Sequence, residues 1–366
     1  MLEITKPSLI VDELRVKRNI ERIAMKTENS SLLFRPHFKT HQSALIGEWF
    51  RDLGISAITV SSLDMAEYFA SHNWNDITVA VPTNIKQIEK INSLARSLKL
   101  NLLVESTDTA HFLKKSVQFP INIWIEIDIG YKRSGVRWQD KEKIDNIAQI
   151  ITQAENLTLE GILTHAGQTY QATTVIEIQQ IHHDSIHKMN DVKNFLISHG
   201  FPDIKISIGD TPTCSIAADF SGVDEIRPGN MVFYDLQQVS LGVCDEKDIA
   251  ITVACPVIGR YPDRHELVIY GGAIHLSKEF LLREDDSRCF GKIVLPTNNG
   301  WSKPVFNAYV SSISQEHGII KANKEFISKI NIGDILMILP VHSCLTANLY
   351  KNYHSLDGRI IENIHS

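Results

Sequence analysis

Residues 13 to 235 alternate between short apolar runs and longer amphipathic stretches, and this alternation constrains the fold more than any other feature. The runs are rich in β-branched residues, as strands are, while stretches such as NIKQIEKINSLARSLK repeat apolar residues with helical spacing. The eight runs expected to form strands are residues 32–35, 56–60, 77–81, 101–104, 123–128, 159–164, 204–208 and 225–227. Eight strand and helix alternations of this length predict an α/β fold, a (β/α)8 TIM-like barrel.

The character of the sequence changes after Tyr234. Strand-like runs such as AITVACPVIGRY, ELVIYGGA and DILMILPV follow one another, separated by Gly, Pro, Asn and Asp. We therefore expect two domains, a barrel over residues 13–238 and a C-terminal all-β domain over residues 239–366 that residues 1–12 complete.

Charge and hydropathy limit the kinds of partner. The 366 residues carry a formal net charge of -6 and contain no long Lys/Arg run, which argues against nucleic acid as the main partner. No stretch is apolar enough to span a membrane, and the acidic start MLEITKPSLIVDEL does not resemble a secretion signal. The five cysteines form no C-x-x-C pair and are odd in number, which fits reduced thiols. The sequence thus predicts a cytoplasmic protein, with no membrane or nucleic-acid partner, that binds small molecules or further subunits.

The stretch RPHFKTH follows the first expected strand and concentrates basic groups. If the backbone stays extended, Arg35, His37, Lys39 and His41 point to the same side. Neighbouring cations would lower the proton affinity of the Lys39 amine, which suits a nucleophile at neutral pH. The alternative interpretation is the solvated edge of a strand.

Polar residues also follow the later strands, at the end of a barrel where active sites lie. After the seventh strand, Gly209 permits close backbone approach and Asp210 or Thr211 can cap a helix, an arrangement typical of phosphate binding. An ordinary capped helix is the alternative. A phosphate site together with a reactive lysine indicates pyridoxal 5'-phosphate, held as a Schiff base.

The segment LPVHSCLTAN contains a candidate metal site. His342 and Cys344 are two residues apart, so on an extended segment both would face the same way. Zinc accepts imidazole and thiolate together, and two protein ligands would leave positions open for substrate. A chance H-x-C pair is the alternative.

Taken together, RPHFKTH, DIGYKRSGV, GDTPT, EIRPGNMVFYD, SQEHG and HSCLTAN resemble the D-serine dehydratase and D-threonine aldolase family, whose barrel is shared with alanine racemases. The resemblance implies that Lys39 carries the cofactor and that His342 and Cys344 bind Zn²⁺, with Mn²⁺ or Mg²⁺ as alternatives. It also implies a head-to-tail homodimer. The other residues that it places around the cofactor are Gly209, Asp210 and Thr211 at the phosphate, Arg133 near the phenolic oxygen, and Gln168, Tyr170 and Tyr234 in the pocket.

The resemblance implies a lyase that acts on a β-hydroxy D-amino acid. In dehydration, Lys39 would remove the α-proton and the metal would polarise the β-hydroxyl, giving a keto acid and ammonia. D-threonine aldolase-type cleavage is the first alternative, with His165 as a candidate base. Racemisation using Tyr309 or Tyr350, and a cofactor-binding protein without catalysis, are further alternatives. The sequence departs from many relatives at VIYGGAIHLSKE, where His275 either supports the metal or faces the β domain.

Overall fold

The computed structural model describes residues 3–28 and 31–366. The chain divides into two compact units. The barrel unit comprises Arg22–Lys39 and Gly47–Gly229, and the β unit comprises the described part of Met1–Glu21 together with Thr40–Ile46 and Asn230–Ser366.

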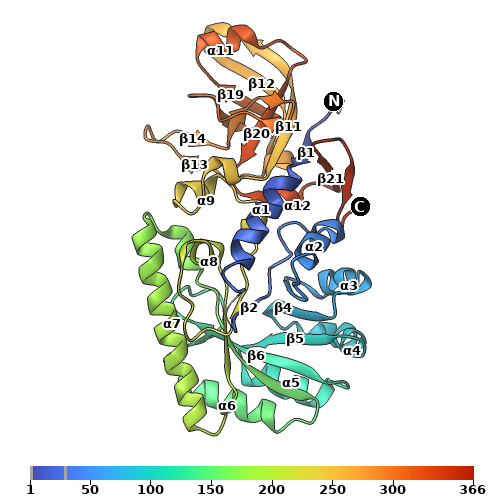
Figure 1. Ribbon diagram of the computed structural model, residues 1–366, viewed down its shortest axis with the longest axis vertical. Helices are drawn as coiled ribbons and strands as arrows, with labels where there is room; N and C mark the ends of the chain where they lie inside the picture. Colours follow the sequence, from blue (N-terminus) through green and yellow to red (C-terminus); the bar gives the residue numbers. More distant parts are fainter. Residues whose placement is uncertain (1–2, 29–30) are drawn as a thin grey trace. The chain divides into compact units, whose positions relative to one another are not determined.

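A path of eight parallel strands forms the barrel unit. It runs in the order β2-β10-β9-β8-β6-β5-β4-β3 (Figure 1). The strands are β2 (Leu33–Phe34), β3 (Ala57–Val60), β4 (Asp76–Pro82), β5 (Lys99–Val104), β6 (Ile121–Asp128), β8 (Leu157–Leu163), β9 (Lys205–Ile208) and β10 (Glu225–Ile226), with β7 (Val136–Arg137) paired to β6. Each of the eight expected runs overlaps one of them, so the predicted barrel fold is confirmed.

Helices connect these strands and lie outside them (Figure 1). They are α3 (Leu63–Ser71), α4 (Ile88–Ala95), α5 (Thr107–Ser116), α6 (Lys141–Thr152), α7 (Val175–Ser198), α8 (Thr211–Ile216) and the 3-10 turns η1 (Ile85–Gln87) and η2 (Gly167–Gln171). Helices α1 (Glu13–Ala24) and α2 (Ala44–Arg51) each contain residues of both units.

The barrel closes where the chain leaves β2. His37 forms a parallel bridge with Thr59 of β3. The Phe38 N–H donates to the Thr59 carbonyl over 2.8 Å, and the Thr59 N–H donates to the Pro36 carbonyl over 2.9 Å. These bonds join the two ends of the strand path and leave Lys39 just beyond the closing seam.

A buried polar layer fills part of the barrel interior, and Arg35 is its centre. Arg35 Nε donates to Glu225 over 2.6 Å, and its Nη1 donates to Asp76, also over 2.6 Å. Asn101 donates to the same Asp76 carboxylate, and Ser207 donates to Glu225. Although burial opposes the charged form, these two carboxylates raise the pKa of Arg35. Arg35 therefore serves the core of the barrel, and its charge is already balanced.

The expected extended backbone does not continue through RPHFKTH. The backbone is extended only to His37, and residues 38–41 form a turn. The prediction that Arg35, His37, Lys39 and His41 share one face by strand alternation is therefore wrong, because alternation holds only where the backbone stays extended. The chain turns here because His37 lies at the barrel seam and Phe38 must enter the core.

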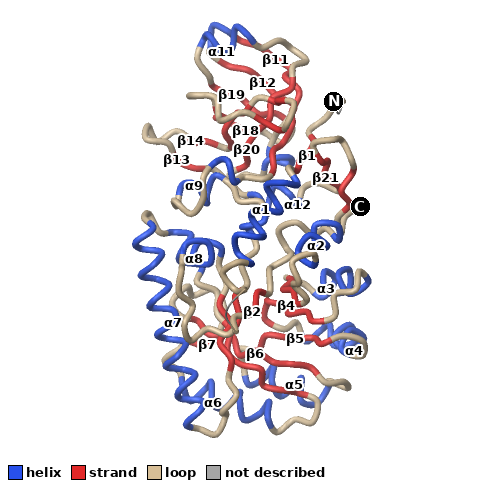
Figure 2. The backbone as a smooth tube through the Cα atoms, viewed as in Figure 1, coloured by secondary structure: helices blue, strands red, loops and turns tan. Residues whose placement is uncertain are grey.

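The β unit is built on one sheet with the order β12-β19-β18-β15-β20-β11-β1-β21-β22, antiparallel except between β1 and β21. Figure 2 shows strands of this unit, among them β11, β12, β18, β19 and β20, in red. Its strands are β1 (Ser8–Val11), β11 (Ile251–Tyr261), β12 (Glu266–Tyr270), β15 (Gly291–Val294), β18 (Tyr309–Ile313), β19 (His317–Lys321), β20 (Ile335–Pro340), β21 (Asn352–Ser355) and β22 (Ile360–Glu362). Two further pairs are β13 (Leu281–Leu282) with β14 (Arg288–Cys289), and β16 (Pro296–Thr297) with β17 (Gly300–Trp301).

Short helices complete this unit: η3 (Asn230–Val232), α9 (Leu236–Ser240), η4 (Glu246–Asp248), η5 (Pro262–Arg264), α10 (Ala273–Leu276), α11 (Lys324–Lys329) and α12 (Ser343–Asn348). The expected C-terminal all-β character is confirmed. Helix α12 follows β20 directly and carries the H-x-C segment.

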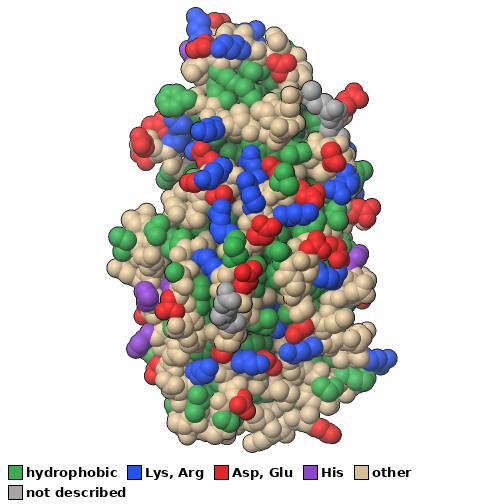
Figure 3. Space-filling view, viewed as in Figure 1, with side chains coloured by type: hydrophobic (Ala, Val, Ile, Leu, Met, Phe, Trp, Pro, Cys, Tyr) green, Lys and Arg blue, Asp and Glu red, His purple; other side chains and the backbone are tan. Residues whose placement is uncertain are grey.

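The surface is mixed in charge. On the face seen in Figure 3, Lys and Arg side chains are interspersed with Asp and Glu side chains, as on an ordinary solvated surface. Over the described ranges, no helix is long and apolar enough to cross a membrane.

Candidate active site

Lys39 is presented by a turn that an aromatic anchor holds. The buried Phe38 ring packs against the rings of Phe50, Phe69 and Trp74, at centroid distances of 5.0, 4.9 and 5.0 Å. The next side chain, Lys39, is exposed. Burial of Phe38 thus fixes the turn from which the lysine amine projects.

His37 shapes this turn with its own side chain. The Lys39 backbone N–H donates to His37 Nδ1 over 3.3 Å, so the neutral ring carries its hydrogen on Nε2. Burial, followed by the charges of Lys39 and Arg227, lowers the pKa of His37 well below its usual range. His37 is therefore a neutral hydrogen-bond donor at physiological pH.

His165 has the opposite tautomer. Its Nδ1 bonds the Gly209 carbonyl, which only accepts, so Nδ1 carries the hydrogen and Nε2 keeps a lone pair. Burial and the nearby Arg133 charge lower the pKa of His165 to about 3. The ring is neutral at physiological pH and can accept a proton at Nε2.

Polar groups gather at the start of α8 in the barrel unit. Asp210 caps the helix by accepting from the Thr213 N–H over 2.7 Å, and Thr169 Oγ1 donates to the same carboxylate over 3.1 Å. Burial raises the pKa of Asp210 to about 6. The Thr211 N–H donates to the Tyr170 hydroxyl over 3.3 Å. The Tyr170 hydroxyl thus lies at the helix end that Asp210 caps.

Some buried polar atoms at or near this helix end remain unsatisfied. Within residues 3–28 and 31–366, Thr211 Oγ1 and Gln168 Oε1 have no hydrogen-bond partner. Gly209 leaves no room for a side chain, since a Cβ there would lie 2.9 Å from the Cβ of Arg227. Buried polar atoms normally find partners, so these groups fit a bound polar group such as a phosphate.

The Arg133 side chain lies over the Tyr131 ring, which in turn packs against His165. Its guanidinium lies 5.5 Å from the Tyr131 ring centroid, and that ring packs at 5.8 Å from the ring of His165. Gly167 is required beneath Tyr131, because a Cβ there would lie 2.3 Å from the ring. The barrel unit thus contains eight of the predicted site residues: Lys39, Arg133, His165, Gln168, Tyr170, Gly209, Asp210 and Thr211.

Tyr234 belongs to the β unit. Its side chain is fully buried, and its backbone has a φ of 47°, in the left-handed region. The Tyr234 N–H donates to the Asn230 carbonyl over 2.8 Å, which holds the residue in the turn after η3.

Sequence reasoning missed the role of Arg227. Its Nε donates to Ser207 Oγ over 2.7 Å and its Nη2 donates to the Thr164 carbonyl over 2.5 Å. Burial lowers the pKa of Arg227 to about 10, and its charge acts on both His37 and His165. The available signal was its position directly after the eighth strand, at the barrel end where the other polar residues gather.

Glu126 was also missed. It lies on β6 and is 4% exposed. One oxygen accepts from Ser134 over 2.7 Å, and the other has no partner among the described residues. Burial raises the pKa of Glu126. The signal was a carboxylate within the apolar run INIWIEID, where a charged side chain is costly.

The predicted metal ligands His342 and Cys344 lie at the start of α12 in the β unit. His342 is the extended N-cap residue, with φ -132° and ψ 102°, while Cys344 is already in the helix. The expectation that an extended segment carries both side chains is therefore wrong. Both ring nitrogens of His342 are buried and have no partner in the described part of the chain, which fits a metal ligand.

Among the described residues, no third protein ligand accompanies His342 and Cys344. Over residues 3–28 and 31–366, no group of three or more His, Cys, Asp and Glu side chains is arranged to hold a metal. His275 is used locally, since its Nδ1 accepts from the Gly272 N–H over 3.2 Å. The Tyr350 hydroxyl donates to the His275 carbonyl over 3.1 Å.

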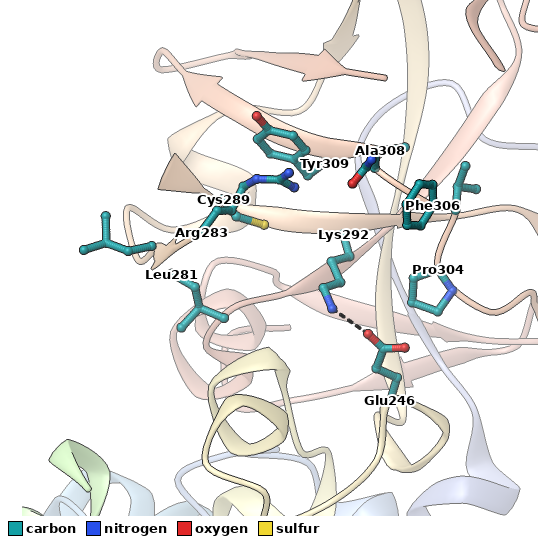
Figure 4. A pocket seen from close by; sticks show the side chains of 12 residues that line it. Glu246, Leu281, Arg283, Cys289, Lys292, Pro304, Phe306, Ala308 and Tyr309 are labelled. Atoms are coloured by element: carbon teal, nitrogen blue, oxygen red, sulfur yellow. Dashed lines mark hydrogen bonds and ion pairs between the residues drawn. The ribbon is translucent and has the colours of Figure 1, made fainter. Parts of the chain in front are cut away.

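A separate cavity of about 470 Å³ lies within the β unit (Figure 4). Figure 4 shows Lys292 paired with Glu246 on one wall. Arg283 lies 4.0 Å from the Tyr309 ring centroid on another wall. None of the predicted cofactor or metal residues lines this cavity.

Comparison with known proteins matches both parts of the chain. The family model for the alanine racemase N-terminal domain matches residues 11–237, and that for a putative serine dehydratase domain matches residues 250–356. A D-threo-3-hydroxyaspartate dehydratase from a Delftia species is 30% identical, with 98% of this chain and 97% of the relative covered. A D-serine dehydratase from Dictyostelium discoideum is 29% identical, with 98% and 95% covered.

The Delftia dehydratase also provides similar solved structures. One has a TM-score of 0.90 at 28% identity, with 99% of this chain and 98% of the other covered. The barrel, the lysine turn and these matches define an alanine racemase-like enzyme of the pyridoxal phosphate-dependent fold type III class. Within that class, the chain belongs to the D-serine dehydratase and D-threonine aldolase family, and it is a lyase. The resemblance read from the sequence is confirmed.

Proposed function

We propose that this protein removes water from a β-hydroxy D-amino acid, as a D-serine dehydratase does, and yields a keto acid and ammonia. The observation that carries the proposal is the pair His342 and Cys344, because both buried ring nitrogens of His342 lack a partner in residues 3–28 and 31–366. A metal ion suits an imidazole and a thiolate at this spacing. The names of the Delftia and Dictyostelium relatives support the same reaction.

The barrel unit offers the groups that pyridoxal phosphate needs. Lys39 would hold the cofactor through its exposed amine, and Thr211 Oγ1 would donate to the phosphate beside Gly209 and Asp210. Arg133 would face the phenolic oxygen, while Gln168, Tyr170 and Tyr234 would line the ring. When bound, the cofactor would supply the electron sink that stabilises negative charge at the substrate α-carbon.

The residues of the barrel unit divide the proton chemistry between them. The Lys39 amine would take the α-proton of the substrate at Nζ. His165 is neutral and keeps a lone pair at Nε2, so it can accept a proton from a hydroxyl. The proposed dehydration would use the Lys39 amine, whereas an aldolase reaction would rely on His165 as the base.

The metal would act as a Lewis acid on the substrate β-hydroxyl. We propose zinc, because thiolate and imidazole suit a borderline-soft cation, with Mn²⁺ or Mg²⁺ as alternatives. Solved structures of a D-threo-3-hydroxyaspartate dehydratase include a Cys→Ala mutant in the metal-free form and a His→Ala mutant. They support a metal in that relative.

We also propose a cytoplasmic homodimer. The five cysteines are not joined in disulfides, as expected in a reducing compartment. The dimer follows from the resemblance stated above, and light scattering of the purified protein would test it.

Product analysis tests the reaction. The purified protein, supplied with pyridoxal phosphate and zinc, is offered D-serine, D-threonine and D-threo-3-hydroxyaspartate separately. Keto acid and ammonia in equal amounts support the dehydratase. Glycine and an aldehyde would overturn it in favour of the aldolase reaction.

A further inference from the structure

The sulfur of Cys344 has two polar neighbours besides any metal. Thr40 Oγ1 lies 3.2 Å from Cys344 Sγ, and Asn230 Nδ2 donates to the same sulfur over 3.7 Å. Thr40 is fully buried and Asn230 is 6% exposed. Both contacts therefore lie within the protein, where hydrogen bonds are less weakened by competition with water.

The hydrogen-bond partners of Asn230 fix which way its side-chain amide faces. Its Nδ2 donates to Asp235 over 2.6 Å, and the Asp235 carboxylate also accepts the Ser343 N–H over 2.9 Å. Since a carboxylate accepts and does not donate, the amide nitrogen must face this side. Its second hydrogen is directed to Ser343 Oγ, 3.0 Å away, and to the sulfur.

Hydrogen bonds of the neighbouring residues Gln42 and His41 hold the segment that contains Thr40. The Gln42 side chain donates to Asn348 over 2.8 Å, at the end of α12. The buried Tyr353 hydroxyl donates to the His41 carbonyl over 2.9 Å. The segment that carries Thr40 is thus tied to the helix of Cys344 and to β21, and its hydroxyl needs no reorganisation to reach the sulfur.

We propose that Thr40 and Asn230 are positioning residues for the metal: they donate hydrogen bonds to the Cys344 thiolate, hold its sulfur in place and set how strongly it binds the ion. The inference rests on the proposed metal pair. Partners of this kind are worth about 10–100-fold in metal affinity. Hydrogen bonds also lower the energy of the sulfur lone pairs, so they raise the energy of sulfur-to-metal charge transfer.

The test uses cobalt and zinc with the full-length cofactor-loaded protein. We expect Thr40→Val to weaken zinc binding about tenfold in chelator competition and to move the sulfur-to-cobalt band to longer wavelength. Thr40→Ser, which keeps the hydroxyl, should restore both. Thr346→Val is the matched control. Thr346 is a buried threonine of α12, the helix of Cys344, and its hydroxyl donates to the Leu276 carbonyl over 3.1 Å. Thr40→Ala replaces the valine variant if that variant does not fold.

The outcomes separate the inference from the proposed function. A cobalt band that is absent from the wild type, or that persists in Cys344→Ala, overturns the metal pair and with it this inference. A wild-type band that Cys344→Ala abolishes, with the band and zinc affinity unchanged in Thr40→Val, overturns the role of Thr40 alone. Equal effects in Thr346→Val would do the same, since they would reflect general damage to α12.

Discussion

The Thr40 hydroxyl lies 3.2 Å from the Cys344 sulfur, although 304 positions separate the two residues in the chain. Thr40 directly follows Lys39, the residue proposed to hold the cofactor. RPHFKTH thus contributes to both proposed sites, with Lys39 in the barrel unit and Thr40 beside a proposed metal ligand in the β unit.

Lys39→Ala should abolish both the covalent attachment of the cofactor and proton transfer. We expect keto acid formation to fall by about 10²–10⁴-fold, the range for loss of a general base. The absorbance of lysine-bound pyridoxal phosphate should also be lost. Lys115→Ala, a change at an exposed lysine of α5, serves as the control. Normal turnover by Lys39→Ala would show that another amine does the chemistry.

His342→Ala should remove the metal without removing the cofactor. A Lewis acid supplies several kcal/mol to such a reaction, so dehydration should slow by about 100-fold or more. Pyridoxal phosphate absorbance should remain. Treatment with a chelator should have the same effect on the wild type, and added zinc should reverse it. If the variant keeps both its metal content and its rate, the assignment of His342 is wrong. Cys244→Ser, which alters a cysteine outside the pair, is the matched control.

Glu126→Gln should stabilise the protein at neutral pH. Burial raises the pKa of Glu126 above its ordinary 4.5, so the folded state keeps this proton to a higher pH than the unfolded state. Stability is therefore lost as pH rises from 4.5 through the folded pKa. The amide cannot ionise, so the variant should exceed the wild type at pH 8 and match it near pH 4. Urea unfolding at both pH values measures this.

The control for that experiment is Glu279→Gln, at an exposed position, which should show no such pH dependence. A stability difference of equal size at pH 4 and pH 8 would mean that packing, and not ionisation, explains the effect of Glu126→Gln.

Arg35→Ala should destabilise the barrel strongly. The change leaves Glu225 buried without its 2.6 Å partner, and breaking a buried ion pair costs about 3–5 kcal/mol. Arg264→Ala removes an exposed arginine that pairs with Glu266 over 3.0 Å, and it should cost no more than about 1 kcal/mol. Chemical unfolding compares the two. Similar losses in both variants would contradict the structural role of Arg35.

Much of the candidate site could be predicted from local sequence, because its residues follow strands. His165 follows β8, and Gly209 and Asp210 follow β9. Parallel strands of a barrel end on one rim, so strand positions alone were enough to bring these residues together. Asp210 was likewise recognisable as a helix cap, since capping depends on residues within one turn.

Other residues could not be assigned in this way. Arg35 looked like a site residue, but its partners Glu225 and Asp76 are 190 and 41 positions away. Glu126 looked like an ordinary strand residue. It is distinguished only by its burial and by its own Oε2, which has no hydrogen-bond partner among the described residues. The few residues on either side of Arg35 and Glu126 indicate neither which groups they will pair with nor whether they will be buried.

The sequence by itself determined the eight strands, the helices between them and the family, because periodicity, capping and short motifs depend on neighbouring residues. Only the tertiary structure decided that residues 38–41 turn, that Arg35 belongs to the core, and that Thr40 meets Cys344. Those outcomes depend on barrel closure and on contacts between distant segments, where burial determines which polar group pairs with which.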